Sequence, residues 1–353
     1  MELRAMVVLA TGNLLRAEVE ALVNTVNTVG VMGKGVALQF KQAYPDNTKA
    51  YESACRKGQV LIGRMFVTYT GKLEPRLIIN FPTKRHWRAA SKLEDIQAGL
   101  VDLVQVIRNE KIKSIALPPL GCGLGGLRWE DVRPLIERAF ETLPGVEVRL
   151  YAPGQAIAPE ERIVNTPKPA MNAWRAALIM VVDAYRALGS DATHLEAQKL
   201  LYFLATAGEP VKTNFTKGRY GPYDEGMVYA LKTMDGHYVV GFGDGDRLEP
   251  VRLKPGAYQE AEQFIRAESK SGEASERIDL VADLIDGFET PYGLELLATV
   301  HWVATREGAD TLDKAIEQVA AWNDRKRRVM KPEHLAIAWK QLQDQGWMSR
   351  IVS

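Results

Sequence analysis

The sequence predicts an α/β domain with a mixed sheet flanked by helices, followed by a mostly α-helical domain. In residues 1–155, short apolar runs typical of strands alternate with longer segments whose apolar residues recur at helical spacing. Four prolines then fall between residues 153 and 169, where periodicity is weak, and beyond them the pattern is almost entirely helical. We therefore expect a first domain at 1–155, a linker at 156–170 and a second domain at 171–353.

The expected elements follow from these two periodicities, because apolar runs between turn residues indicate strands and apolar residues three or four apart indicate helices. In the first domain the strands are 5–10, 21–27, 64–70, 77–81, 114–120 and 146–150, and the helices are 36–57, 93–111 and 130–143. In the second domain the helices are 173–188, 194–207, 225–234, 257–268, 276–287, 293–306, 311–323 and 332–345, with a turn at 219–222 and a short strand at 238–242.

Composition sets the class of protein. The chain has 353 residues, 46% of them hydrophobic, which is enough for two packed cores. No stretch is long and apolar enough for a membrane span or a signal peptide, and the two cysteines imply no disulfide framework, so we expect a cytoplasmic protein. The net charge is +6 over residues 1–155 and −5 over the remainder. A basic first half suits a polyanionic substrate, and an acidic second half suits a basic partner.

A glycine-rich loop at residues 121–126 is the most informative motif. It follows an apolar strand and precedes a helix, so its backbone N–H groups and the positive end of the helix dipole favour a diphosphate. The string also matches the G-x-G-x-x-G fingerprint of dinucleotide-binding folds, with Glu147 at the spacing of the acidic partner. That fold opens with the motif and needs several further strands, whereas only one follows here.

A second glycine loop, residues 30–37, opens a helix and offers another phosphate site. It is not a Walker A loop, because Gly35 stands where a magnesium-binding Ser or Thr is required after Lys34. Asn24 and Asn27 precede this loop at a strand end, where their amides are expected to hydrogen-bond ribose hydroxyls, although a lone Asn at such a position more often stabilises a turn.

These motifs, in this order, resemble the macrodomain, an α/β module that binds ADP-ribose. The resemblance rests on VNxxN at Asn24 and Asn27, on GVMGKGVA in the second glycine loop and on LGCGLGG around residues 120–126, and it covers nearly all of residues 1–155. It implies a substrate-binding set formed by the three loops. Its members are Gly12, Asn13, Leu14, Asn24, Asn27, Gly33, Lys34, Gly35, Val36, Gly121, Cys122, Gly123, Leu124 and Gly125.

Within macrodomains, the segment Thr83-Lys84-Arg85 and the loop before Trp129 resemble the branch that contains the terminal ADP-ribose protein glycohydrolase. They are more similar still to the DarG family of antitoxins, which remove ADP-ribose from thymine in single-stranded DNA. The resemblance implies that Lys84 is catalytic. The protein-directed enzyme has an Asp that works with this lysine, and here that position is Gly125, so the second catalytic group stays open.

Lys84 can act as a nucleophile or assist the departing base, and a nucleophilic lysine needs a lowered pKa, which we expect the nearby Arg85 and Arg88 to provide. Arg85, Trp87 and Arg88 combine cations with an aromatic ring, as in single-strand binding surfaces, and we expect them to contact nucleic acid. Cys122 is expected to pack rather than react. The five histidines and two cysteines show no zinc spacing, so neither a metal nor a cofactor is expected.

The second half resembles Panacea-type antitoxin domains through QKLLYF at residues 198–203 and RYGP at 219–222. In DarG proteins this region binds and inhibits the cognate ADP-ribosyltransferase toxin, DarT, so the resemblance implies a toxin-binding role for residues 171–353. The leading interpretation is a two-domain antitoxin with DNA ADP-ribosyl glycohydrolase activity. The alternatives are a non-catalytic ADP-ribose reader joined to a protein-interaction module, and a glycohydrolase acting on ADP-ribosylated protein.

Overall fold

The computed structural model describes residues 6–154, 157–187, 191–242, 250–267 and 271–351 of the chain. It divides into two compact units, Met1–Pro167 and Lys168–Ser353. The expected element ends at residues 5, 188 and 268 lie outside the described residues.

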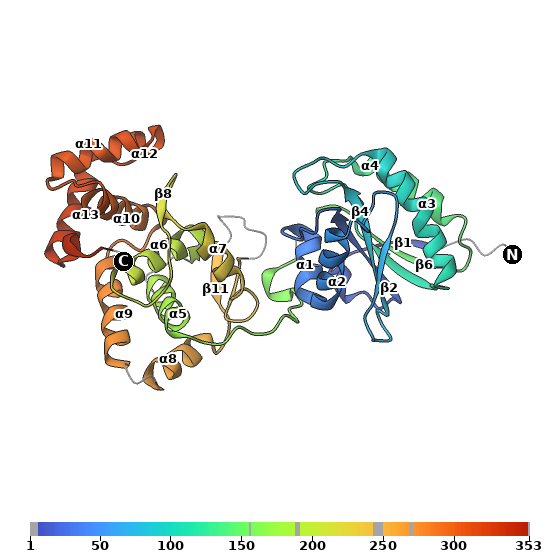
Figure 1. The fold of residues 1–353 in the computed structure, drawn as a ribbon, viewed down its shortest axis with the longest axis horizontal. Coiled ribbons are helices and arrows are strands. Elements are labelled where there is room, and N and C mark those ends of the chain that lie inside the picture. Colours follow the sequence, from blue (N-terminus) through green and yellow to red (C-terminus); the bar gives the residue numbers. More distant parts are fainter. Residues whose placement is uncertain (1–5, 155–156, 188–190, 243–249, 268–270, 352–353) are drawn as a thin grey trace. The chain divides into compact units, whose positions relative to one another are not determined.

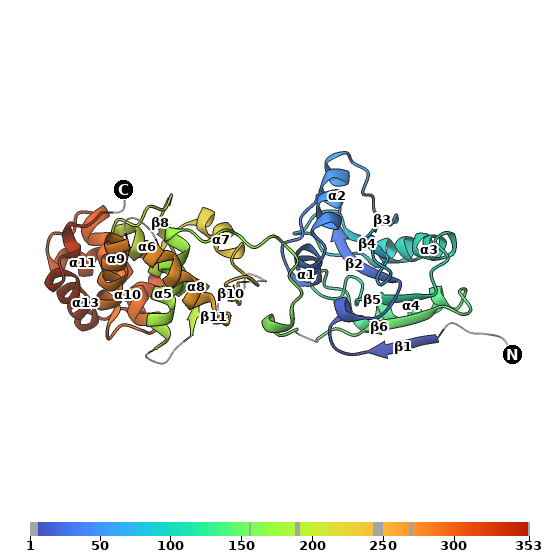
Figure 2. The ribbon, with the colours of Figure 1, turned by 90° about the horizontal axis from the view of Figure 1, so that it is seen from below.

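The first unit is built on a six-stranded sheet whose order is β1-β6-β5-β2-β4-β3 (Figures 1 and 2). All neighbours are parallel except β3, which is antiparallel to β4, so the predicted mixed sheet is confirmed. Its elements are β1 Met6–Ala10, a 3-10 turn Leu14–Arg16, β2 Ala21–Asn27, α1 Gly35–Ala43, α2 Pro45–Arg56, β3 Phe66–Tyr69, β4 Leu77–Lys84, α3 Leu93–Asn109, β5 Ser114–Leu117, α4 Trp129–Phe140, β6 Glu147–Tyr151 and a 3-10 turn Pro159–Glu161.

The sheet is covered on both faces, which explains why its central strands are continuous apolar runs. Val23 of β2 points to the face that packs against α3 and α4, whereas its neighbour Leu22 points to the opposite face with Phe40 of α1. This alternation fixes the register of the sheet, because a shift by one residue would exchange the two cores.

Two departures from the expected elements have local causes. The expected helix 36–57 is two helices, because Pro45 lacks the N–H that would continue α1 and restricts Tyr44 before it to a non-helical conformation. Strand β4 runs three residues further than expected, through Pro82 to Lys84. The antiparallel partner β3 begins at Phe66, opposite Asn80, so Pro82 lies beyond that ladder, and the extra residues of β4 pair with β2 alone, up to Asn27 opposite Lys84.

The segment expected to be a linker divides between the two units. Asn165 donates from its backbone N–H to Gln42 O at 2.9 Å and from its side chain to Ala43 O at 2.7 Å. The backbone oxygen of Glu161 accepts from the Asn13 side chain at 3.2 Å. Residues 157–167 are therefore held against the first unit despite their prolines.

The second unit is mostly helical, and its core surrounds the buried helices α6 and α10. The short strand expected at 238–242 is confirmed as β10. The elements absent from the sequence prediction are the other short strands of two to four residues, which are too brief to show periodicity, the six-residue helix α12 and the final 3-10 turn. No helix in the described part of the chain has the length and apolar character needed to cross a membrane. Its elements are α5 Ala173–Arg186, β7 Ala192–Thr193, α6 His194–Thr206, β8 Thr216–Gly218, β9 Gly221–Tyr223, α7 Glu225–Lys232, β10 Val239–Val240, β11 Pro250–Leu253, α8 Ala257–Ala267, α9 Ser271–Ile285, α10 Pro291–Arg306, α11 Leu312–Trp322, α12 Asp324–Val329, α13 Pro332–Asp344 and a 3-10 turn Trp347–Ser349.

Candidate functional site at the carboxyl edge of the sheet

The predicted site residues belong to four loops that leave the same edge of the sheet. Strands β1, β2, β4 and β5 are parallel members of one sheet, so the loops that follow them emerge together at their carboxyl ends. Ligands of open α/β sheets bind at this edge. The order of the strands thus brings together motifs that lie as far apart in sequence as residues 12 and 125.

Hydrogen bonds between the loops close the edge. Lys84 Nζ donates to Leu124 O at 2.9 Å, which joins the end of β4 to the glycine-rich loop after β5. Thr28 Oγ1 donates to Arg85 O at 2.8 Å, which joins the loop after β2 to the same strand end. The Ser91 N–H donates to Gly125 O at 2.9 Å. Sequence reasoning missed Thr28 and Ser91, because neither belongs to a motif.

Lys84 is the last residue of β4 and is half-buried, so the strand backbone fixes where its side chain starts. Partial desolvation lowers its pKa below the ordinary lysine value. The expected cause was the charge of Arg85, and the structure corrects this. The Arg85 guanidinium forms a bidentate pair with Asp95, with N–O distances of 2.6 and 3.1 Å, so its charge is compensated.

The two asparagines of β2 are buried. Asn24 has no exposed surface, and its amide donates to Asn80 Oδ1 at 3.0 Å, while Asn80 in turn donates to Asn47 Oδ1 at 2.7 Å. In this structure the enclosed amide supports the strand end, and its contact with a ribose stays a prediction. Its Oδ1 has no hydrogen-bond partner among the described residues.

Asn27 closes the turn between β2 and the second glycine loop. Its Oδ1 accepts from the N–H groups of Val29 and Val31 at 3.0 and 3.3 Å, and its Nδ2 donates to Val31 O at 2.6 Å. Tyr51 OH donates to the Asn27 carbonyl at 2.6 Å. In this structure Asn27 shapes the loop, and its contact with a ribose stays a prediction.

The second glycine loop lies at the surface. Gly33 and Lys34 are exposed, and α1 starts at Gly35 without a side-chain cap from Lys34. A Cβ on Gly35 would meet no atom within 4 Å, but its φ of +58° lies in the left-handed region. Val36 packs beside Phe40, which anchors the first turn. The first N–H groups of this helix are thus arranged as in anion sites.

The loop after β1 contributes less than expected. The Asn13 side chain caps the 3-10 turn by accepting from the Leu15 N–H at 3.0 Å, and the Leu14 side chain is buried in the core. Gly12 is exposed, with φ of +89°. The side chains of Asn13 and Leu14 serve the fold, and Gly12 has none, so a ligand contact at this loop would come from the backbone.

The glycine-rich loop after β5 is tightly folded at one end and open at the other. A Cβ on Gly125 would lie 2.3 Å from Ser91 Oγ and 2.4 Å from Gly121 O, whereas a Cβ on Gly123 would meet nothing within 4 Å. Position 125 therefore has no space for any side chain, including the Asp of the protein-directed glycohydrolase. The buried Ser91 hydroxyl fills that space and has no hydrogen-bond partner among the described residues.

Cys122 is half-buried in the glycine-rich loop. Burial, together with the nearby carboxylates of Glu130 and Asp131, raises the pKa of its thiol to about 11. The side chain packs against the core formed by α3, α4 and the sheet, as expected from the sequence.

The segment after Arg85 is exposed. Trp87 is 45% exposed, and the guanidinium of Arg88 lies 4.4 Å from the centre of its ring. The His86 ring lies 5.4 Å from the same ring. Of the predicted nucleic-acid contacts, Trp87 and Arg88 form one exposed aromatic and cationic surface, whereas Arg85 faces Asp95 on α3. No group of three or more metal-ligating side chains occurs among the described residues.

In the second unit, the first motif of the sequence analysis contacts the segment that follows the second motif. Gln198 of α6 donates to Asp224 O at 3.0 Å and accepts from the Asp224 N–H at 3.2 Å. Asp224 also caps α7 through its carboxylate. Leu200, Leu201 and Phe203 are buried, as expected, so this part of the motif is structural.

Comparison with known proteins agrees with this arrangement. The family model of the macro domain matches residues 23–136. The chain is 50% identical over 336 residues to a DNA ADP-ribosyl glycohydrolase of Thermus aquaticus, covering 95% of this chain and 92% of the relative. It is 44% identical over 348 residues to the protein of the same name from Mycobacterium tuberculosis, covering 94% and 98%.

Solved structures give a further likeness. The macrodomain of Mycobacterium tuberculosis DarG is 59% identical, with a TM-score of 0.42, and covers 42% of this chain and 99% of that one. Among sequence relatives, a fusion of a DNA ADP-ribosyl transferase and a DNA ADP-ribosyl glycohydrolase from Thermosipho africanus is 35% identical over 171 residues, covering 44% of each chain. On the two full-length relatives, the chain belongs to the DNA ADP-ribosyl glycohydrolase family, DarG.

Proposed function

We propose that the first unit removes ADP-ribose from thymine bases of single-stranded DNA and that Lys84 is the catalytic residue. The observation that carries the proposal is the position of Lys84. Its ammonium is held against the glycine-rich loop by Leu124 O at the edge of the sheet where both glycine loops meet. The two relatives that match over nearly their whole length are named DNA ADP-ribosyl glycohydrolase.

The chemistry required is cleavage of an N-glycosidic bond. The bond between the anomeric carbon of the ribose and the base nitrogen breaks, its electron pair passes to the nitrogen, which takes up a proton, and water supplies a hydroxyl to the carbon. The two helix N-termini favour the diphosphate and fix the ribose. The Lys84 ammonium, held at the loop, is placed to stabilise the negative charge that develops on the departing base.

The lowered pKa of Lys84 also keeps a second route open. A neutral Lys84 amine would attack the anomeric carbon directly, and the resulting adduct would then be hydrolysed. The two routes differ in one observable, because only the second leaves ADP-ribose covalently attached to the chain.

The test uses an oligonucleotide that carries ADP-ribose on thymine. We expect the wild-type chain to release free ADP-ribose and Lys84→Ala to lose at least about a hundredfold in rate, since a positioned acid or base contributes about 10²–10⁴. Lys113→Ala is the control, because Lys113 is an exposed lysine that precedes β5, at the opposite edge of the sheet. Binding without release by the wild-type chain would establish the reader instead, and release only from ADP-ribosylated protein would establish the protein-directed enzyme.

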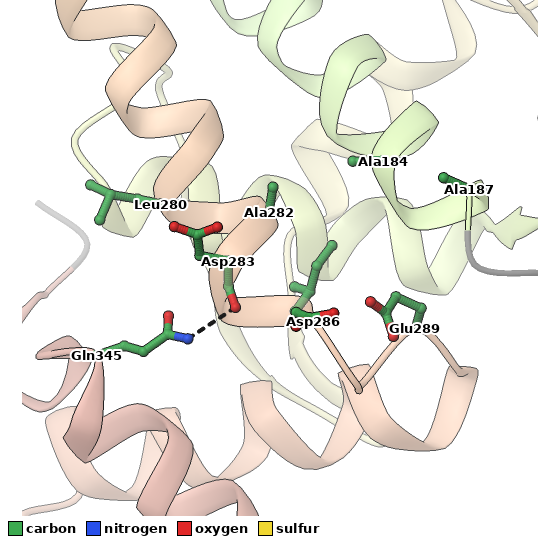
Figure 3. A pocket seen from close by; sticks show the side chains of 9 residues that line it. Ala184, Ala187, Leu280, Ala282, Asp283, Asp286, Glu289 and Gln345 are labelled. Carbon is green, nitrogen blue, oxygen red and sulfur yellow. Dashed lines mark hydrogen bonds between the residues drawn. The ribbon is translucent and has the colours of Figure 1, made fainter.

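We also propose that residues 171–353 bind and neutralise the DarT toxin. The second unit has a cavity of about 760 Å³ between α5 and the end of α9 (Figure 3). Asp283, Asp286 and Glu289 line it beside apolar side chains, and Gln345 donates to the Asp283 carbonyl at 2.9 Å. This surface suits a basic segment of a toxin that itself binds DNA, because opposite charges steer and orient the complex.

Charge removal tests the docking surface. We expect the triple variant Asp283→Asn/Asp286→Asn/Glu289→Gln to weaken the complex with DarT at low salt and to reduce its salt dependence. A control variant removes the same charge from exposed acidic residues elsewhere in the unit: Asp313→Asn, Glu317→Gln and Glu333→Gln. Equal losses in both variants, or a complex insensitive to salt, would exclude this cavity as the electrostatic contact.

A further inference from the structure

The second unit holds a basic cleft far along the chain from the loops of the first unit. Its volume is about 570 Å³, and it lies between the β8–β9 hairpin and the turn that joins α11 to α12. A cavity of this size accommodates a nucleotide. The side chains that form its walls are Lys217, Arg219, Trp322, Asn323, Arg325 and Arg328, with Asp324 as the acidic member.

Two hydrogen bonds fix the walls relative to each other. Trp322 Nε1 donates to Gly218 O at 2.9 Å, and Asn323 Nδ2 donates to Arg219 O at 3.1 Å. Each bond joins a side chain of the helical turn to the backbone of the hairpin tip. The cleft is therefore formed before any ligand arrives, which lowers the entropic cost of binding.

Aromatic rings hold the cations in place. Lys217 Nζ lies 4.5 Å and Lys326 Nζ 5.0 Å from the centre of the Trp322 ring. The guanidinium groups of Arg325 and Arg219 lie 4.7 and 5.6 Å from the centre of the Tyr220 ring. These contacts restrict long, flexible side chains at modest desolvation cost.

The cations at the surface are only partly compensated. Lys217 pairs with Glu307 at 2.7 Å, and Asp324 pairs with Arg327 at 3.4 Å, outside the walls. Arg219 and Arg328 form no ion pair with any described residue and both are exposed; Arg328 Nε donates to the Asp324 carbonyl at 3.3 Å, which leaves its two terminal nitrogens for a ligand. Two guanidinium forks can therefore reach a ligand, and such forks match phosphate oxygens.

The charge beneath the cleft has the same sign. Lys326, which has no exposed surface, donates to Glu295 Oε1 at 2.7 Å and to Thr299 Oγ1 at 2.8 Å. Arg325 donates to the same Glu295 oxygen at 2.6 Å. The buried Lys199 donates to the Leu195 carbonyl at 3.0 Å.

Three cations therefore lie near the buried carboxylate of Glu295, and the buried carboxylate of Glu196 also acts on Lys199. The consequence is visible in Lys326, whose pKa is lowered to about 8 by burial and by the charges of Lys199 and Arg325, against the favourable influence of Glu295. The three cations still outnumber the two carboxylates, and unbalanced positive charge is costly in a protein interior unless something offsets it. An anion seated in the cleft would do so.

We propose that this cleft is a phosphate-binding site that takes a nucleotide, either free or as part of a single strand, with Arg219 and Arg328 as the two forks. The site is separate from the four loops around Lys84 and does not depend on glycohydrolase activity.

The probes are a fluorescein-labelled oligothymidylate of ten nucleotides without ADP-ribose and, as competitor, thymidine 5′-monophosphate. Anisotropy titrations of the full chain at several salt concentrations compare the wild type with Arg219→Gln/Arg328→Gln. We expect affinity for the bound probe to fall about tenfold. The slope of strand affinity against salt should fall by about 0.7 for each phosphate that is no longer neutralised, or about 1.4 for both arginines. Competition by the mononucleotide identifies a free nucleotide as sufficient, and binding of the strand alone identifies the polymer.

Two further variants complete the test. Arg219→Lys/Arg328→Lys keeps both charges and removes both forks, so it is expected to retain most of the salt dependence with reduced affinity. Arg266→Gln/Lys340→Gln removes the same charge from two side chains of this unit that are each 75% exposed, and should bind as the wild type does.

Two outcomes would overturn the proposal. One is that Arg219→Gln/Arg328→Gln binds both probes as tightly as the control pair does. The other is that this variant loses the DarT toxin while strand binding is unchanged, which would make the cleft a protein contact. Release of ADP-ribose is measured in parallel for this variant and for the wild type. Absence of release by the wild type would count against the proposed function and not against this site.

Discussion

Gly125 provides the sharpest test of how the glycine-rich loop is built. The φ angle of Gly125 is not positive, so glycine is needed there for space alone. In Gly125→Ala the new Cβ would lie 2.3 Å from Ser91 Oγ and 2.4 Å from Gly121 O, where ordinary contact begins at 3.4 Å. Each neighbour must retreat by about 1 Å, and overpacking of this kind costs about 1–3 kcal/mol.

The strain in Gly125→Ala would appear either as lower stability or as weaker binding of ADP-ribose. If the loop keeps its shape, the free energy of unfolding falls by that amount, which urea denaturation measures. If the loop moves away, the bond from Lys84 to Leu124 O is broken, and the affinity for ADP-ribose falls by about 5- to 150-fold, as calorimetry would show. Gly123→Ala is the matched control, because its Cβ meets nothing within 4 Å and its φ is not positive.

A second substitution refines the argument. Ser91→Ala in the Gly125→Ala background removes the contact with Oγ but leaves the carbonyl of Gly121, so we expect only partial recovery. The reasoning is refuted if Gly125→Ala matches Gly123→Ala in both stability and ADP-ribose affinity.

Three further substitutions have separate readouts. Asn27→Ala should lower the free energy of unfolding by about 1–3 kcal/mol, because it leaves buried turn groups without partners; lower ADP-ribose affinity at unchanged stability in urea would instead support the predicted ribose contact. Trp87→Ala should weaken binding of the modified strand by about 1–3 kcal/mol in anisotropy titrations and leave binding of free ADP-ribose unchanged; equal losses would indicate a folding role. Burial lowers the pKa of His301 to about 4, so between pH 6.5 and pH 4 the unfolded chain binds a proton that the folded chain does not. His301 should therefore cost the second unit about 3 kcal/mol of stability as pH falls over that range. Denaturation midpoints of His301→Gln should fall less steeply with acid than those of the wild type, and parallel curves would contradict this.

The strands of the sheet and most helices could be predicted because the hydrophobic pattern of each element lies within a short stretch of sequence. Each strand of the first unit is a short apolar run, and each long helix shows its own apolar stripe, so no long-range information was needed. The failures lie where a single residue changes the backbone, as at Pro45, or where neighbouring strands decide the length, as at Lys84 in β4. The two-residue strand β7 exists only through its partner β11, which sequence periodicity cannot reveal, whereas the short strand expected at 238–242 is confirmed as β10.

For the site, sequence reasoning located the loops but not the roles of individual side chains. Motif order identified the glycine loops, and the parallel sheet explains why they meet. The motif could not distinguish a side chain that faces a ligand from one that holds the loop, and in this structure Asn13 caps a turn and Asn24 is enclosed at the strand end. Ser91 and Asp95 were invisible for the opposite reason, since their significance comes only from what they contact in space.

The pairing of Arg85 with Asp95 bears on how Lys84 is tuned. A free guanidinium next to Lys84 would lower the lysine pKa by repulsion, and this effect would weaken in salt because the group is exposed. With that charge compensated, the pKa is lowered by desolvation, which depends on how tightly the loops close around the strand end. Closure in turn depends on Gly125, whose lack of a side chain lets Ser91 pack against the glycine-rich loop while Leu124 O accepts from Lys84. The space at position 125 and the protonation of Lys84 are therefore physically linked, so a substitution that opens the loop should move the lysine pKa back toward its ordinary value as well as weaken substrate binding.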